Sequence, residues 1–220
     1  MMIKQHKFKN IYTDGKRLYT LNAAPSIRFF EEKTIQQDGK EYRQWDPRKS
    51  KLAAAIMKGI KEIGFSPDSK ILYLGASHGY TPSFISDIAD KGVIFAVDFA
   101  PRVVRDLVFL SEKRKNLIPI IGDANQPETY ANKVIDADFI YQDIAQKNQA
   151  GIFLKNIKMF LKPKGFAFLC VKSRSIDIAK KPRQVFSETR QMLEKELEII
   201  DYKELEPFEM DHCVFLCRKR

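Results

Sequence analysis

The chain has 220 residues, 44% of them hydrophobic, and its 38 lysines and arginines outnumber its 28 aspartates and glutamates to give a net charge of +10. This length suits one medium-sized domain, alone or with a small appendage, and the hydrophobic content suffices for a buried core. No apolar run approaches the roughly 20 residues of a membrane span, and the polar, basic first ten residues lack a signal-peptide core, so we expect no membrane partner.

The first 50 residues differ from the rest and predict a small antiparallel β domain. Residues 17–21 and 27–30 alternate apolar and polar side chains, as short strands do. Asp-Gly dipeptides, which are typical of hairpin turns, begin at positions 14 and 38. Because a few short strands are barely stable alone, we expect this domain, residues 1–50, to pack on a larger one, residues 51–220.

A helix is predicted where the two domains join. Asp46 followed by Pro47 is typical of a helix cap and a first helical residue. Apolar side chains then recur at helical spacing from Leu52 to Ile63 and stop at Gly64. This pattern predicts one helix that begins at Pro47 and ends near Gly64.

Strands and helices alternate in the remainder of the chain. Near-continuous apolar runs predict strands at residues 70–74, 93–98, 117–121, 137–142 and 166–172, and helical spacing predicts helices at residues 82–89, 101–113, 147–161 and 182–197. Only seven residues separate the last two predicted strands, 198–205 and 213–217, so these two must run antiparallel. We therefore expect an α/β fold with a parallel sheet closed by a C-terminal antiparallel strand, the layout of Rossmann-like class I methyltransferases.

A glycine-rich turn, GASHGYT at residues 75–81, follows the first of these strands, and Asp98 ends the next strand 23 residues after Gly75. Such glycines let the backbone approach a ligand, and such an acid accepts hydrogen bonds from ribose hydroxyls. The turn reads GxxxG, whereas a dinucleotide pyrophosphate prefers GxGxxG. A ligand with adenine and ribose but no phosphates, such as S-adenosylmethionine, fits better. A tight turn without any ligand is the alternative.

Further polar residues follow the other predicted strands, at the sheet edge where α/β folds bind ligands. They are Asp123, Asp143, Gln146, Lys172, Arg174 and, before the final strand, His212. Asp98 is placed for the ribose, and Asp123 with Ala124 suits the adenine amine and a backbone contact. Each acid alone could be a helix cap or a turn former, but together they favour a bound ligand.

The basic charge is unevenly distributed. Residues 162–183 carry seven lysines and arginines against one acid, and residues 1–50 carry eleven against six. A positive field of this size favours polyanions, of which nucleic acid is the commonest. A solvated basic face without a partner is the alternative.

The cysteine pattern argues against a metal site. Cys170, Cys213 and Cys217 are an odd number, and they form neither a CxxC pair nor a His/Cys ligand spacing. We expect buried, reduced thiols in a cytoplasmic protein that binds no metal.

Six segments of the chain are distinctive: WDPRKSKLAA at 45–54, LYLGA at 72–76, YQDIAQ at 141–146, LKPKG at 161–165, KSRSID at 172–177 and DH at 211–212. Together these segments resemble the fibrillarin family. They occur in the family's order and cover the chain from about residue 10 to its end, and YQDIAQ and KSRSID are specific to the family. The Gly/Arg-rich arm of eukaryotic members is missing, so the resemblance is to the archaeal form.

This resemblance implies a ribose 2′-O-methyltransferase for ribosomal and transfer RNA that uses S-adenosylmethionine and is directed by box C/D guide RNA. It also implies two protein partners, a Nop5-type scaffold and an L7Ae-like RNA-binding protein. Because the guide pairs with the target, the enzyme need not read sequence, and the chain has no RRM-like or zinc motif for doing so.

The resemblance also implies the site residues. The family's catalytic set falls on Lys51, Asp143, Lys172 and His212, and its cofactor contacts fall on Gly75, Ala76, Tyr80, Thr81, Asp98, Phe99, Asp123, Ala124, Asp143 and Gln146. Tyr80 stands where threonine is usual, and Asp98 replaces glutamate. For the RNA, we expect contacts from Arg174, Lys180, Lys181 and Arg183.

Methyl transfer is an in-line displacement whose barrier falls mainly through alignment, but a ribose hydroxyl also needs help to lose its proton. A lysine, with a pKa of ~10.4 in water, can accept that proton only if burial or a neighbouring positive charge lowers its pKa. We expect the positive charges of Lys51 and Lys172 to lower each other's pKa. The negative charge of Asp143 opposes this lowering, and its carboxylate can orient both amines. We expect Lys172 to accept or orient the proton and His212 to position the network, although coupled groups do not titrate separately.

Two other functions stay open from the sequence. One is a stand-alone methyltransferase that acts on a protein side chain, and the other is a non-catalytic RNA-binding subunit. The presence of all four residues of the catalytic set argues against the second, and a test of guide-RNA dependence separates the first from an RNA-guided enzyme.

Overall fold

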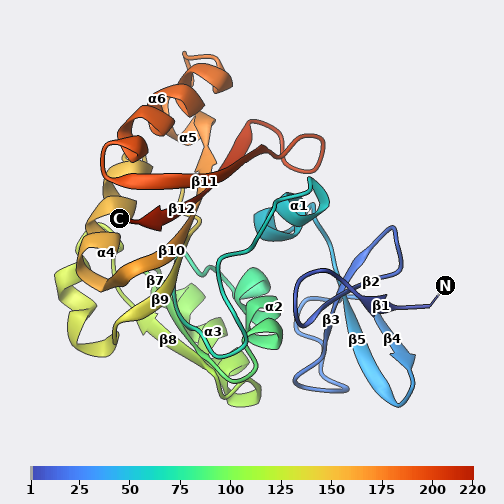
Figure 1. Cartoon of the computed structure of the whole chain (residues 1–220). Coiled ribbons are helices and arrows are strands. Elements are labelled where there is room, and N and C mark those ends of the chain that lie inside the picture. The colour runs from blue at the N-terminus through green and yellow to red at the C-terminus, as the bar shows by residue number, and fades with distance from the viewer. Residues whose placement is uncertain (1) are drawn as a thin grey trace.

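The computed structural model describes residues 2–220, which form two separate β-sheets (Figure 1). The N-terminal sheet is antiparallel and has the strand order β1-β2-β3-β5-β4. Its strands are β1 (Lys4–Gln5), β2 (Ile11–Thr13), β3 (Leu18–Leu21), β4 (Thr34–Gln37) and β5 (Lys40–Trp45). Both predicted Asp-Gly turns join adjacent strands of this sheet, which confirms the expected hairpins.

One strand of that prediction is wrong. Residues 27–30 lie in the loop between β3 and β4, because Phe29 and Phe30 pack against the core of the larger sheet rather than in a ladder. Alternation of apolar and polar side chains does not distinguish these two environments.

The larger sheet has seven strands in the order β11-β12-β10-β9-β6-β7-β8. Five are parallel to one another: β6 (Lys70–Leu74), β7 (Val93–Asp98), β8 (Leu117–Ile121), β9 (Ala137–Gln142) and β10 (Leu161–Lys172). β12 (His212–Lys219) pairs antiparallel with both β10 and β11 (Leu197–Glu204), so it lies between them. The expected parallel sheet with an antiparallel C-terminal strand is confirmed.

Helices cover both faces of this sheet (Figure 1). One face packs on α1 (Lys51–Met57), α2 (Tyr80–Ile88) and α3 (Pro101–Lys113), and the other packs on α4 (Gln149–Phe160) and α6 (Pro182–Glu194). Successive strand residues alternate between these two cores, as Ile71 and Tyr73 on the first and Leu72 and Leu74 on the second illustrate. Two short helices that the sequence does not predict, η1 (Pro127–Lys133) and α5 (Ser173–Ile176), lie in connecting segments.

The predicted start and end of the first helix are wrong. Asp46 does not cap α1, because its Oδ1 accepts the backbone N–H of Arg48 at 2.9 Å and closes a turn before the helix. Ser50 is the cap, with its side chain accepting the N–H of Ala53. The helix ends at Met57, and Gly59, with φ +75°, turns the chain away.

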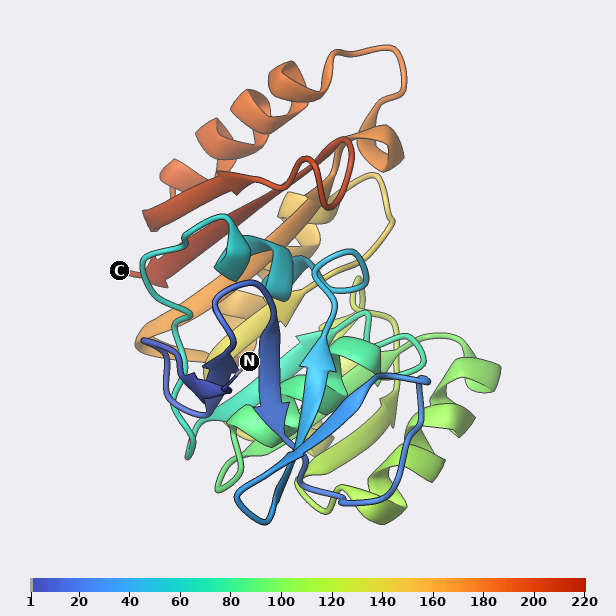
Figure 2. The same cartoon turned by 90° about the vertical axis from the view of Figure 1, so that its right-hand side faces the viewer.

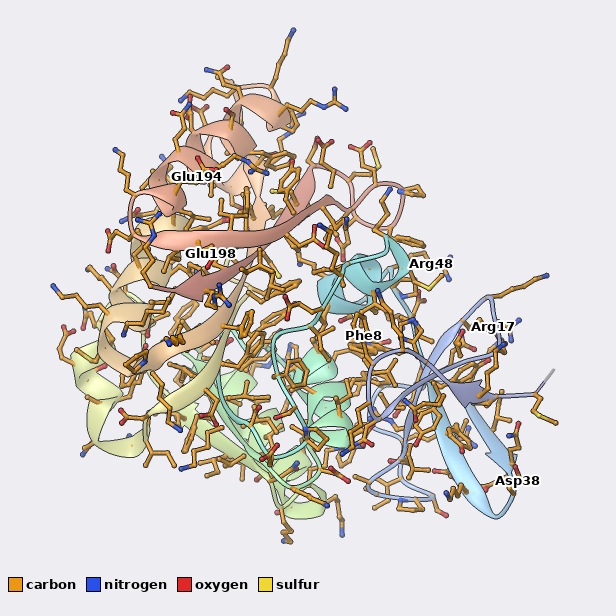
Figure 3. The ribbon with its side chains drawn as sticks, viewed as in Figure 1. Phe8, Arg17, Asp38, Arg48, Glu194 and Glu198 are labelled. Atoms are coloured by element: carbon orange, nitrogen blue, oxygen red, sulfur yellow. The ribbon has the colours of Figure 1, made fainter. Side chains whose placement is uncertain are left out.

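The N-terminal sheet packs on α2 through buried charges. Arg43 of β5 is fully buried and forms ion pairs with Glu32 and with Asp87 of α2, each at 2.7 Å. Arg114 also pairs with Asp87. Phe8, labelled in Figure 3, packs against the core of the larger sheet, and Figure 2 shows the N-terminal strands in front of that sheet.

These contacts make the two sheets one packed structure. We propose residue 50 as the domain boundary, since it lies between β5 and α1. Within residues 2–220 no helix is both long and apolar enough to cross a membrane. All three cysteines are buried free thiols.

Candidate active site

Two adjoining cavities open at the carboxyl ends of the parallel strands. The first, the inner cavity, has a volume of about 290 Å³. It is lined by Gly75, Ser77, Val97, Asp98, Phe99, Gly122, Ala124, Asp143, Ile144, Ala145 and Gln146. These residues lie at or just beyond the ends of β6, β7, β8 and β9. The predicted cofactor contacts Gly75, Asp98, Phe99, Ala124, Asp143 and Gln146 are among them.

Glycine is required at the first position of the turn after β6. Gly75 has φ +80°, and a Cβ atom there would collide with the backbone carbonyl oxygen of Asp143. Its N–H donates to the carbonyl of Val97 at 2.9 Å, which holds the turn against β7. The backbone of the turn therefore lies directly beside Asp143.

Asp98 closes the same turn from the end of β7. Its Oδ2 accepts the N–H of Ser77 at 2.9 Å, and its Oδ1 accepts the N–H of Ala100 at 3.1 Å. Each carboxylate oxygen still has a lone pair for a ribose hydroxyl. The inner cavity thus offers the acid and the close backbone that the adenosine part of S-adenosylmethionine requires, so the residues present fit this ligand.

Asp123 is not among the residues that line the inner cavity. Its Oδ1 accepts the N–H of Asn125 at 2.9 Å, so the carboxylate shapes the turn after β8. Its neighbours Gly122 and Ala124 line the cavity. A contact between Asp123 and adenine stays a prediction.

The second cavity, the outer cavity, has a volume of about 680 Å³ and adjoins the first. It is lined by Phe29, Phe30, Glu31, Lys49, Tyr73, Gly75, Ala76, Ser77, His78, Tyr80, Thr81, Pro82 and Asp143. Gly75, Ser77 and Asp143 line both cavities. Of the predicted cofactor contacts, Ala76, Tyr80 and Thr81 face the outer cavity only.

Sequence reasoning missed Phe29, Phe30, Glu31 and Lys49 as site residues. Lys49 lies within the family-like string WDPRKSKLAA, which was a usable signal. Nothing in the sequence around Phe29 distinguishes it from an ordinary strand residue, because its place in the site depends on packing between the two sheets.

The hydroxyls of Tyr80 and Thr81 are already engaged within the protein. The Tyr80 hydroxyl accepts the N–H of Asp46 at 3.3 Å, and burial raises the pKa of Tyr80 to about 12. The Thr81 hydroxyl donates to the Oγ of Ser50, the α1 cap, at 3.1 Å. These two side chains therefore join the glycine-rich turn to the segment that precedes Lys51.

Lys51 and Asp143 form the central contact of the predicted catalytic set. The Nζ of Lys51, the first residue of α1, donates to Oδ2 of Asp143, which follows β9, at 2.9 Å. The two side chains are only 15% and 27% exposed. Burial, the largest single influence, lowers the pKa of Lys51. The charge of Asp143 and the hydrogen bond to it, together with Cys170 and Glu209, outweigh burial, so the pKa of Lys51 lies above its ordinary value. Lys51 is therefore a cation at neutral pH and a poor proton acceptor.

His212 and Lys172 face each other on neighbouring strands. They are direct partners in the β10–β12 ladder, so their side chains project from the same face of the sheet. His212 is almost fully buried, and burial together with the charge of Lys51 holds its pKa below the ordinary value. In its neutral form Nδ1–H donates to the carbonyl of Met210 at 2.6 Å, which leaves Nε2 as an acceptor.

The Lys172 side chain is exposed and has no ion pair within residues 2–220, in contrast to Lys51. Gln149 fixes its backbone, since Gln149 Oε1 accepts the N–H of Lys172 at 3.1 Å. The structure thus brings Lys51 and Asp143 into contact and places His212 close enough for the charge of Lys51 to lower its pKa. The Lys172 amine is left without an ion pair within residues 2–220.

Most of the predicted RNA-contacting residues are paired with acids. Arg174 pairs with Asp211 at 2.9 Å, Lys180 with Glu188 at 2.7 Å, and Arg183 with Glu204 at 3.5 Å. Lys181 has no ion pair in the described part of the chain. Exposed pairs of this kind contribute little and are screened by salt, so a phosphate can replace the acid. Their contact with RNA stays a prediction, and the free basic charge of this region is smaller than its composition implies.

The chain is similar in sequence to known proteins over its whole length. A family model described as fibrillarin matches residues 3–220. A fibrillarin-like rRNA/tRNA 2′-O-methyltransferase of Methanocaldococcus jannaschii is 49% identical over 215 residues, which cover 95% of this chain and 94% of the relative. The protein of the same description from Thermococcus onnurineus is 45% identical over 225 residues, covering both chains completely.

Solved structures agree with the sequence matches. A Methanococcus jannaschii fibrillarin, described as a pre-rRNA processing protein, has a TM-score of 0.95 and 47% identity, covering 100% of this chain and 98% of its own. Aeropyrum pernix fibrillarin with natively bound S-adenosyl-L-methionine has a TM-score of 0.90 and 38% identity, covering 99% and 98%. A fibrillarin/Nop5p complex has a TM-score of 0.90 and 36% identity, covering 98% and 100%.

Proposed function

Since the chain belongs to the fibrillarin family, we propose that it is a ribose 2′-O-methyltransferase of ribosomal and transfer RNA that uses S-adenosylmethionine. The observation that carries this proposal is the position of Asp143. Asp143 lines both cavities, and its carboxylate accepts a hydrogen bond from Lys51. One residue therefore connects the ligand cavities to the predicted catalytic set.

When bound, S-adenosylmethionine supplies an electrophilic methyl group. The protein's part is to align the ribose hydroxyl with that group and to manage the hydroxyl proton. Lys51 is held as a cation by Asp143, so it orients the carboxylate and stabilises negative charge that develops on the ribose oxygen. We assign proton handling to Lys172, whose amine has no competing ion pair within residues 2–220, and we assign His212 to position the network.

The proposed partners also follow from membership of the fibrillarin family. The solved fibrillarin/Nop5p complex supports a Nop5-type scaffold as a protein partner of this chain. We further propose an L7Ae-like RNA-binding protein and a box C/D guide RNA that pairs with the target, as the family resemblance implies. The buried thiols suit a reducing compartment, so we assign the protein to the cytoplasm.

Reconstitution tests this function. The chain is assembled with a guide RNA, a Nop5-type scaffold and an L7Ae-like protein, and methylation of a paired target RNA is mapped to single nucleotides. We expect methylation at one ribose, its position moving when the guide is changed. Equal methylation without a guide, or methylation of the protein components instead of RNA, would contradict the proposal.

A further inference from the structure

We propose that Gln149 is a positioning residue for methyl transfer, because its buried carboxamide takes the place of a missing strand beside Lys172 and fixes where the Lys172 amine stands relative to Asp143. This inference rests on the proposed function, since it assumes that Lys172 handles the ribose proton. It gives a role in the reaction to two fully buried glutamines, Gln142 and Gln149, that line neither cavity.

Strand β10 extends past the end of its neighbour β9. The parallel ladder between them ends at the pair Leu169 and Gln142, whereas β10 continues to Lys172. Gln149, the first residue of α4, fills the gap. Its Oε1 accepts the N–H of Lys172 at 3.1 Å, and its Nε2 donates to the carbonyl of Lys172 at 3.4 Å. One carboxamide thus provides the two main-chain hydrogen bonds that a neighbouring strand would otherwise supply.

The same contacts determine which kind of ladder pair Lys172 and His212 form. Both main-chain groups of Lys172 bind Gln149, and the carbonyl of His212 accepts the N–H of Leu205 on the β11 side. The main-chain groups of the two ladder partners therefore point away from each other. In an antiparallel ladder such non-hydrogen-bonded pairs have Cα atoms about 4.5 Å apart, against about 5.5 Å in the other kind, and closer side chains. The carboxamide of Gln149 thus stabilises the arrangement that brings Lys172 nearest to His212.

A second buried glutamine holds the first. Gln142 ends β9 directly before Asp143, and its Nε2 donates to the main-chain carbonyl of Gln149 at 2.7 Å. Its Oε1 is buried and has no hydrogen-bond partner within residues 2–220. Such an unpaired acceptor costs stability that an apolar side chain of similar size would not cost, so packing alone does not explain an amide here. Its hydrogen bond to Gln149 does, and it connects the strand end that carries Asp143 to the one that carries Lys172.

The placement of the Lys172 amine depends on its backbone. The side chain is exposed and has no ion pair within residues 2–220, so no charged group holds the amine directly. The next residue, Ser173, is fixed on the β12 side, where its N–H and its hydroxyl both donate to the carbonyl of Asp211, at 3.1 Å and 3.0 Å. Gln149 supplies the contacts on the β9 side. The backbone that carries Lys172 is therefore held on both sides, and Gln149 is the side chain that holds it next to Asp143.

Methylation by the complex assembled with guide RNA and partner proteins tests the inference. Gln149→Met keeps the length of the side chain and removes both hydrogen bonds to Lys172. We expect the single-turnover rate at saturating donor and RNA to fall about five- to thirtyfold, because a misplacement of about 1 Å costs up to about a hundredfold. The KM for target RNA and the calorimetric affinity for S-adenosylhomocysteine should change less than about twofold, since Gln149 lines neither cavity.

A double-mutant cycle separates positioning from a general loss of structure. If Gln149 acts through Lys172, adding Gln149→Met to Lys172→Ala should lower the rate by less than about twofold more. Asn116→Leu is the matched control. The Asn116 carboxamide also binds the main chain, donating to the carbonyls of Ser86 at 3.0 Å and Ala89 at 2.9 Å, but it precedes β8 at the opposite edge of the sheet. This variant should lower the thermal melt and leave the methylation rate unchanged.

Gln142→Met is the second variant, for the case that Gln149→Met does not fold. It leaves both contacts to Lys172 in place and removes only the support of Gln149, so we expect a smaller loss of rate, about two- to fivefold.

A wild-type rate in both glutamine variants would overturn the positioning role, and so would a loss confined to KM. The same holds if Asn116→Leu loses as much rate as Gln149→Met, or if the losses in the double variant multiply. If the wild-type complex does not methylate guided RNA, the proposed function fails; if it does and only the variants disagree, the positioning role alone fails.

Discussion

The inner and outer cavities share three lining residues but come from different parts of the chain. The inner cavity is made by the ends of neighbouring parallel strands in a single sheet, so its residues converge wherever that sheet forms. The outer cavity needs a second element, the loop between β3 and β4, which buried ion pairs hold against α2. The loop between β3 and β4 therefore lines one of the two cavities, and the outer cavity depends on packing that the inner cavity does not require.

The largest effect is expected at the residue that the two cavities share. Asp143→Ala removes the partner of the buried Lys51 amine and a wall of both cavities. The methylation rate should fall by about 10²–10⁴, and both S-adenosylhomocysteine and 5′-methylthioadenosine, which lacks the amino-acid end of the donor, should bind more weakly. Single-turnover methylation and calorimetry measure these quantities. If the affinity for only one of the two ligands fell, Asp143 would contribute to binding in only one of the two cavities.

At Lys172, which lines neither cavity, we expect a comparable loss of methylation rate without a loss of ligand affinity. Lys172→Ala should lower the methylation rate by about 10²–10⁴, because it removes the amine that we assign to the ribose proton. The affinities for both ligands and the thermal melt should change little, since this exposed side chain lines neither cavity. A near wild-type rate in the assembled complex would move proton handling to another group, such as His212.

Disruption of the buried ion pairs should affect the outer cavity selectively. Arg43→Met leaves the buried Glu32 without an ion-pair partner and leaves Asp87 with Arg114 alone, which costs about 3–5 kcal/mol of unfolding free energy. In the folded fraction, S-adenosylhomocysteine, whose amino-acid end we expect in the outer cavity, should bind more weakly and 5′-methylthioadenosine as before. Chemical denaturation and calorimetry test this, with Arg48→Met as control because the Arg48 side chain is exposed and its pair with Asp46 contributes little to stability. Equal weakening of both ligands would mean that the two cavities are not independent.

A smaller effect than at Asp143 and Lys172 is expected for the inner cavity alone. Asp98→Ala removes a charge-assisted hydrogen bond to the ribose, a contribution of about 1.5–3 kcal/mol, so both ligands should weaken by about ten- to a hundredfold. Because both carry the ribose, the two losses should be equal within twofold by calorimetry. Asp98→Asn, which can still accept the N–H of Ser77, reports how much of the loss is turn distortion. Unchanged affinities would contradict the ribose assignment.

The ends of the strands near the site followed from simple patterns. Apolar runs ended at Leu74, Asp98 and Gln142 because the interiors of these strands are buried on both faces, and the polar residues beyond them met at one edge because the strands are parallel. The start of α1 was misassigned because Asp46 and Ser50 are both good caps, and the choice depended on which side chain reached the free N–H groups of the helix.

The sequence by itself determined the α/β order, the glycine turn and the set of polar strand ends, because these features depend on neighbours along the chain. Only the tertiary structure decided which charges stay free. Lys51 and Asp143 are 92 positions apart, and their contact raises the pKa of Lys51. Arg174 and Arg183 pair with acids from other elements, Asp211 and Glu204, and Lys180 pairs with Glu188. The same holds for Phe29 and Glu31, whose place at the outer cavity follows from the packing of the β3–β4 loop and its neighbours on α2. Coulomb interactions and packing depend on distances in space, and local sequence patterns do not contain those distances.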